Sequence, residues 1–102
     1  MMTTQPDRLP QIPELIEELY SMLNDRHIGA VCSIETWECD RFDRQRMQTV
    51  QSMCLEDAIP FLFQADIDQF VITDLSTDWY SFNSMPHEVR SCFIHVQLRR
   101  CI

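Results

Sequence analysis

The sequence predicts a single small domain of the α+β class, with helices packed on one face of a short antiparallel sheet. Its 102 residues match the usual size of one domain. One segment near the N-terminus has the apolar spacing of a helix, and several later segments are rich in β-branched and aromatic residues, as strands are. A mostly helical domain is the alternative. We expect the domain to span 1–102, with 1–10 as a flexible arm.

The first predicted element is a helix over 12–25. Apolar side chains recur there at steps of three and four residues: Ile12, Leu15, Ile16, Leu19, Met22 and Leu23. Pro13 suits a first helical turn, and Gly29, the only glycine of the chain, favours a reversal after the helix. Residues 30–38 then alternate apolar and polar side chains, which predicts a strand.

The middle of the chain predicts two more helices. Asp40 is a suitable cap for a helix over 41–53, in which one face is apolar through Met47, Val50, Met53 and, just beyond it, Cys54. Two acids then follow Leu55, as is typical of the first turn of a helix. A short third helix is therefore expected to start near Leu55.

The C-terminal part predicts strands. Residues 69–73 and 78–82 are short apolar runs with a polar segment between them, which predicts a hairpin. The segment 87–99 fits either a helix or a strand, and the strict alternation of its apolar residues favours a strand, through Cys92, Ile94, Val96 and Leu98.

Charge excludes some partners and favours others. Sixteen acidic residues against eight arginines give a net charge of −8, which repels phosphate backbones and anionic lipid headgroups. Direct binding of nucleic acid or of a membrane surface is therefore not expected. The imbalance is largest in residues 47–88, which contain seven acids and no basic residue other than histidine, so we expect their neutralisation to come from tertiary neighbours or from a partner.

The cellular location is predicted from the absence of a secretory signal pattern in the N-terminal segment. It has no apolar core followed by a small-residue cleavage site, and no apolar stretch reaches the roughly 18 residues of a membrane span. We therefore expect a cytoplasmic protein. The five cysteines are then expected to be reduced thiols, most of them small core residues.

Neither a metal nor a cofactor is expected. The closest approach to a zinc pattern is His87, Cys92 and His95, and in a strand Cys92 and His95 would point to opposite faces. The aspartates at 66–78 lack the glycine-containing turn of a calcium loop. Glycine-rich phosphate loops and nucleophile elbows are also absent, so we expect no enzyme.

Our functional hypothesis is that the chain is a non-enzymatic acidic protein that docks on a basic surface of another macromolecule, such as a nucleic-acid-binding protein. It would act as an inhibitor or nucleic-acid mimic, of the type of phage anti-defence or toxin-immunity proteins. The predicted partner-binding residues combine carboxylates with neighbouring aromatics: Glu56, Asp57, Asp66, Asp68, Asp74, Asp78, Trp79, Tyr80 and Trp37. The alternative is a chaperone or assembly subunit that binds through the apolar face of helix 12–25, as a homodimer.

Overall fold

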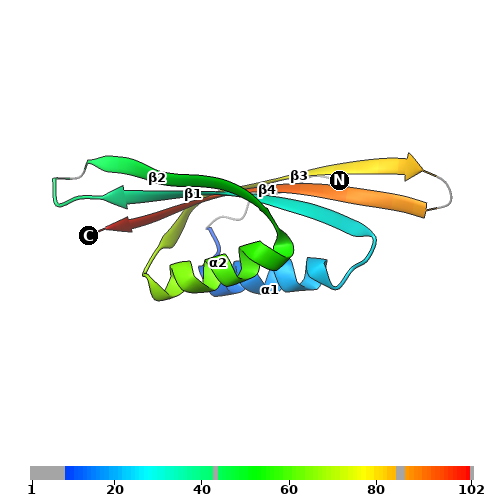
Figure 1. Cartoon of the computed structure of the whole chain (residues 1–102), viewed down its shortest axis with the longest axis horizontal. Coiled ribbons are helices and arrows are strands. Elements are labelled where there is room, and N and C mark those ends of the chain that lie inside the picture. Colours follow the sequence, from blue (N-terminus) through cyan, green and yellow to red (C-terminus); the bar gives the residue numbers. More distant parts are fainter. Residues whose placement is uncertain (1–8, 43, 85–86, 102) are drawn as a thin grey trace.

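The computed structural model describes residues 9–42, 44–84 and 87–101. Six elements follow one another along the chain: α1 (Ile12–Leu23), β1 (Ile28–Cys39), β2 (Gln45–Cys54), α2 (Leu55–Ile67), β3 (Val71–Ser84) and β4 (His87–Cys101). The strands form one sheet in the order β2-β1-β4-β3 (Figure 1). The chain is thus an α+β domain, and most of the predicted arm at 1–10 lies outside the described residues.

The sheet is mixed, so the prediction of an antiparallel sheet is wrong. β1 pairs antiparallel with β2, and β3 pairs antiparallel with β4, but the two central strands β1 and β4 run parallel. Parallel neighbours need a long crossover connection, because the chain must return to the same end of the sheet. Here β2, α2 and β3 together make that crossover.

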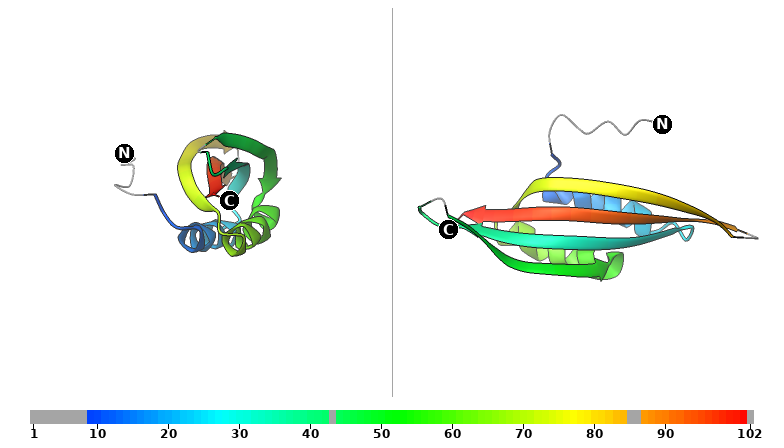
Figure 2. Two further views of the ribbon diagram at one scale, coloured as in Figure 1. Left: turned by 90° about the vertical axis from the view of Figure 1, so that its left-hand side faces the viewer. Right: turned by 90° about the horizontal axis from the view of Figure 1, so that it is seen from above.

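Both helices lie on the same side of the sheet in Figure 1, and the end-on view of Figure 2 shows them next to each other. One cluster of buried side chains joins the helices to the strands, and Leu19, Leu62, Ile34, Ile94 and Leu98 are at most 2 % exposed within it. The helix predicted over 12–25 is confirmed as α1. Its apolar stripe is buried in the chain's own core.

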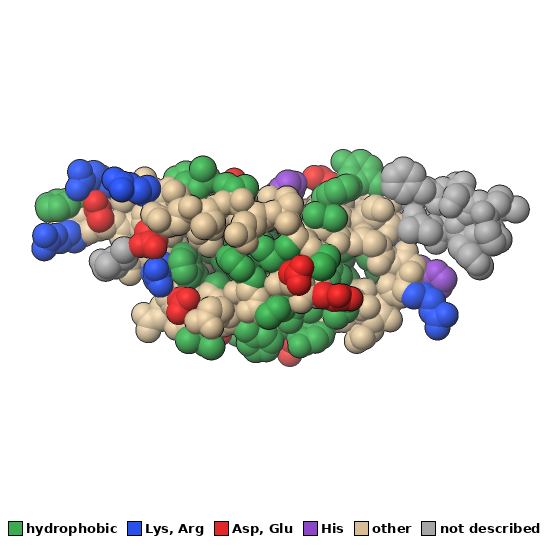
Figure 3. Space-filling view, in the orientation of Figure 1, with side chains coloured by type: hydrophobic (Ala, Val, Ile, Leu, Met, Phe, Trp, Pro, Cys, Tyr) green, Lys and Arg blue, Asp and Glu red, His purple; other side chains and the backbone are tan. Residues whose placement is uncertain are grey.

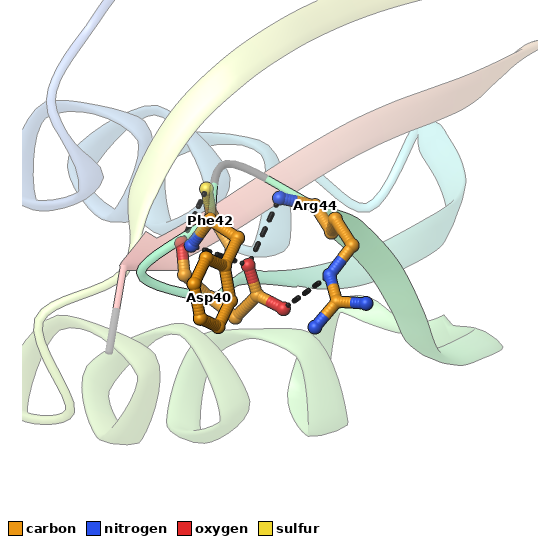
Figure 4. A network of polar contacts seen from close by, with 4 residues as sticks. Asp40, Phe42 and Arg44 are labelled. Carbon is orange, nitrogen blue, oxygen red and sulfur yellow. Dashed lines mark hydrogen bonds and ion pairs between the residues drawn. The ribbon is translucent and has the colours of Figure 1, made fainter.

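The helix predicted over 41–53 is wrong, because this segment forms the β1–β2 turn and strand β2. Met47 and Val50, assigned to the buried face of a helix, are 48 % and 53 % exposed. The carboxylate of Asp40 accepts hydrogen bonds from the backbone N–H groups of Phe42 (2.8 Å) and Arg44 (3.0 Å), as Figure 4 shows. Asp40 therefore closes a hairpin turn instead of capping a helix.

The hairpin predicted from 69–73 and 78–82 is wrong as well. Both runs belong largely to the single strand β3, which continues through the polar segment between them and pairs with β4. A bulge between Ile72 and Asp74 interrupts the pairing. The strands predicted at 30–38 and 87–99 are confirmed as β1 and β4, and the third helix is confirmed as α2.

The end of α2 provides a test of backbone strain. Gln69 follows the helix with a positive φ of 67°, a conformation that glycine adopts without steric cost. The N–H of Gln69 donates to the carbonyl of Asp66 (3.1 Å), and the N–H of Phe70 donates to that of Ala65 (2.9 Å), as in a Schellman motif. Gln69→Gly is therefore expected to raise the free energy of unfolding by about 0.5 to 1 kcal/mol in a denaturant titration. A decrease would show that the contacts of the glutamine side chain, together with the greater unfolded-state entropy of glycine, outweigh the strain.

Candidate protein-interaction surface

The two helices concentrate negative charge on one layer of the molecule. We call this surface the acidic helix layer and define it by the carboxylates of α1, α2 and the turns that follow them: Glu14, Glu17, Glu18, Asp25, Glu56, Asp57, Asp66 and Asp68. All are exposed except Asp68, which is half-buried. Residues 12–27 and 55–70 contain a single arginine, Arg26, so this layer is strongly negative.

The local sequence explains why these carboxylates face solvent. The buried residues of α1 fall on one stripe, Ile12, Leu15, Ile16 and Leu19, so the glutamates between them lie on the opposite side of the helix. In α2, Glu56 and Asp57 occupy the first turn, where carboxylates interact favourably with the helix dipole. The packing that builds the core thus places the acids outside it.

The ion pairs described between side chains involve other carboxylates. Arg44 pairs with Asp40 (2.9 Å) and Arg100 with Glu38 (3.0 Å). Asp40, at the hairpin turn, has its pKa lowered mainly by the backbone N–H of Arg44. Apart from Glu14, which has interactions of its own, the carboxylates of the acidic helix layer form no ion pair among the described residues, so their charge is left for solvent or for a partner.

The structure separates the six acids that the sequence analysis grouped together. Glu56, Asp57, Asp66 and Asp68 belong to the acidic helix layer. Asp74 and Asp78 pair in register with Gln97 and Phe93 of β4, residues that alternate with the buried Ile94 and Val96. Because paired residues share a face and successive residues alternate, Asp74 and Asp78 lie on the side of the sheet away from the helices.

The three aromatic residues predicted to bind a partner also lie apart, and each contacts its own chain. The indole N–H of Trp37 donates to Glu35 (3.3 Å), and the ring of Tyr80 meets that of Phe93 edge-on at 5.6 Å between centroids. Trp79 pairs with the buried Cys92 and so lies on the helix side of the sheet, where the guanidinium of Arg90 is 4.4 Å from its ring centroid. They do not form one aromatic cluster within an acidic surface.

Sequence reasoning missed the acids of α1. Residues 1–46 contain nine acids but also five arginines, so that part of the chain does not stand out as acidic. Three of those arginines, Arg41, Arg44 and Arg46, lie in and beside the β1–β2 turn, and Figure 3 shows basic side chains gathered at that end of the molecule. Counting charge per predicted element would have identified α1, which contains no basic residue.

The other side of the sheet has a small hollow of about 190 Å³, lined by Trp37, Gln45, Thr73, Gln97 and Arg99. The side-chain amide of Gln97 donates to Glu35 (2.9 Å), the same carboxylate that accepts from Trp37. The lining residues include no carboxylate, histidine or thiol, so the hollow itself offers no general base of the usual kinds.

The described thiols divide into buried and exposed groups. Burial raises the pKa of Cys32 to about 11, and burial also raises the pKa of Cys92. A thiol with a raised pKa is a weaker nucleophile at neutral pH, because little of it is thiolate. Cys54 and Cys101 are exposed.

No group of three or more His, Cys, Asp or Glu in the described part of the chain is arranged to hold a metal ion. Cys92 is buried on the helix side of β4, whereas His95 is exposed and, three residues later in the strand, points to the other side. The side chain of His87 lies outside the described residues.

Neither helix of the described part has the length and apolar character required to cross a membrane. Comparisons with protein-family models, with curated proteins and with solved structures found no match to this chain.

Proposed function

We propose that this chain is a non-enzymatic cytoplasmic binding protein that docks its acidic helix layer on a basic surface of another macromolecule. The observation that carries the proposal is the placement of eight carboxylates and one arginine on two adjacent helices and the turns that follow them, in a chain with a net charge of −8. Such a surface attracts a basic partner over distances of about a Debye length and speeds productive encounter.

Apolar side chains within the same layer supply contact area. Tyr20 of α1 is 47 % exposed, and Phe63 and Ile67 of α2 are 50 % and 71 % exposed. Interfaces gain most of their affinity from a few such side chains, whereas the surrounding charges set orientation and exclude wrong partners. The layer thus combines apolar anchors with a negative field.

The partner class that fits best is a protein with a surface that normally holds nucleic acid. Carboxylates fixed on two neighbouring helices present repeated negative charge on a rigid support, and an arginine-rich groove recognises that pattern in phosphates. The chain would then act as an inhibitor or nucleic-acid mimic by occupying the groove.

The alternative is a chaperone or assembly subunit that dimerises through the apolar stripe of α1. Most of that stripe is buried inside this chain, so it offers little surface to a second copy. Ile12, Leu15, Ile16 and Leu19 are 5 % exposed or less and belong to the core cluster with residues of the strands and α2, whereas Leu23 at the end of the stripe is 37 % exposed. A dimer through α1 would need a different side of that helix.

The test is a pull-down from lysate of the native host at low salt with the tagged full chain, eluted in steps of increasing salt. The helix-layer variant, Glu17→Lys with Asp66→Lys, is compared with a control variant, Asp74→Lys with Asp78→Lys. Both variants change the net charge from −8 to −4, so overall charge cannot explain a difference between them. Lysine near the C-terminus of α2 is also favourable for that helix.

The helix-layer variant is expected to bind the captured protein at least about tenfold more weakly than the wild type, while the control variant changes affinity by less than about threefold. The captured protein should be basic and should elute at moderate salt. Equal losses in the two variants, or a greater loss in the control, would contradict the proposal.

A further inference from the structure

We infer that a second copy of this chain pairs with β2, antiparallel and edge to edge, so that two four-stranded sheets become one continuous sheet. This inference concerns an edge of the sheet and does not depend on the proposed function of the helix layer. It follows from three features of β2: its place in the sheet, its lack of protecting residues, and the opposite charges at its two ends.

β2 is an edge strand, since β1 is the one strand that pairs with it in the described part of the chain. Nine of its ten residues are exposed, and only Met53 is half-buried. Its outer edge therefore presents backbone N–H and C=O groups to solvent, which is a template for another strand.

Beyond the bulge at Gln48, the edge carries neither charged residues nor prolines, which usually prevent such pairing. Residues 47–55 contain no charged residue and no proline, and include the β-branched Thr49 and Val50. The other edge strand, β3, carries Asp74 and Asp78 within its length. Charged residues and prolines are the common means by which edge strands avoid association, so β2 is the less protected edge.

Charge complementarity identifies the occupant as a second copy. Arg46 is the second residue of β2, next to Arg44, which pairs with Asp40 of its own chain, and Glu56 and Asp57 follow the end of β2 in the first turn of α2. When two copies of β2 pair antiparallel about their centres, the basic end of each strand lies beside the acidic end of the other. A parallel arrangement would instead place like charges together.

In a symmetric pair of copies, the contact between a basic and an acidic strand end occurs twice. A two-fold axis through the middle of the paired strands creates two identical contacts, each between the basic end of one copy and the acidic end of the other. The pairing of β1 with β2 shifts register between Thr36 and Trp37, which leaves Gln48 as an extra residue in β2. The regular part of the edge is therefore Thr49–Cys54. The local attraction acts against the overall repulsion between two chains that each carry −8.

A charge exchange between the two ends tests the inference. Arg46→Glu removes the net positive charge from the beginning of β2, and Glu56→Arg removes the net negative charge that follows its end, so each variant alone is expected to dimerise at least about tenfold more weakly than the wild type. An equimolar mixture of the two restores opposite charges at both contacts. The mixture is therefore expected to form a heterodimer with an affinity close to that of the wild-type dimer.

Association is measured by sedimentation velocity of the full chain under reducing conditions, so that the exposed Cys54 and Cys101 form no disulfides. Arg26→Glu and Glu17→Arg serve as controls, since they change the net charge by the same amounts at sites away from β2. A wild type that stays monomeric at millimolar concentration, or a mixture that associates no better than each variant alone, would overturn the inference. Slower amide hydrogen exchange in β2 at higher protein concentration would support it, and unchanged exchange would contradict it.

Discussion

Leu19→Ala is expected to lower the free energy of unfolding by about 2 to 5 kcal/mol, a large part of the total for a domain of this size. Leu19 is 1 % exposed and lies in the core cluster with side chains of α2 and the central strands. Truncation removes apolar contacts and leaves a cavity that the surrounding residues fill only in part. Denaturant titration monitored by far-UV circular dichroism measures the change.

Leu23→Ala is the matched control, because Leu23 belongs to the same helix but is 37 % exposed. Its substitution is expected to cost less than about 1 kcal/mol. The midpoint of unfolding of both variants should be compared at two protein concentrations. A loss of stability for Leu19→Ala that grew with protein concentration would indicate that the apolar stripe of α1 belongs to a dimer interface instead of the core of one chain.

Arg100→Met is expected to cost about 1 to 3 kcal/mol, because Arg100 connects three parts of the fold. Its guanidinium pairs with Glu38 of β1 (3.0 Å), donates to the carbonyl of Asp68 (3.4 Å) and lies 4.6 Å from the ring centroid of Phe70. Methionine retains the apolar stem but leaves the half-buried Glu38 without its cation. Thermal and denaturant unfolding both report this loss.

Arg99→Met provides the comparison one residue earlier in the same strand. Arg99 is also half-buried, but it lines the hollow on the other side of the sheet. Its substitution is expected to change stability by less than about 1 kcal/mol. Equal effects of the two substitutions would show that the contacts of Arg100 contribute no net stability.

The elements that sequence reasoning predicted correctly have one buried face. In α1 that face requires a periodic stripe, and in β1 and β4 it requires alternation. Cys92, Ile94, Val96 and Leu98 of β4 are all buried, which is why the strand pattern there is regular.

β2 could not be predicted in this way, because nearly all of its residues are exposed and its sequence is under no demand for alternation. Its few apolar residues, such as Met47 and Val50, then happened to fit helical spacing. The polar stretch inside β3 looks like a hairpin turn in the sequence for the same reason. β3 is an edge strand, and exposed polar residues such as Ser76 and Thr77 are tolerated there. The parallel pairing of β1 with β4 depends on long-range contacts that no local pattern contains.

The candidate site was predicted only in part. The sequence identified Glu56, Asp57, Asp66 and Asp68 as carboxylates without arginines nearby in the chain. The neighbouring acids of α1 were missed because the distance between two helices is a property of the fold, and Asp74 and Asp78 were included although the sheet separates them from the rest. The clustering of charged residues in the sequence predicts their clustering in the folded structure only within one helix or strand.

The proposal that the acidic helix layer binds a basic partner is best tested by the salt dependence of that binding. The dissociation constant of the wild-type complex should rise steeply between low and high salt, because ions screen charges near a protein surface. We expect a clearly shallower dependence for the Glu17→Lys, Asp66→Lys variant and an almost unchanged dependence for the Asp74→Lys, Asp78→Lys control. Salt-independent binding by the wild type, or the same slope in both variants, would contradict it.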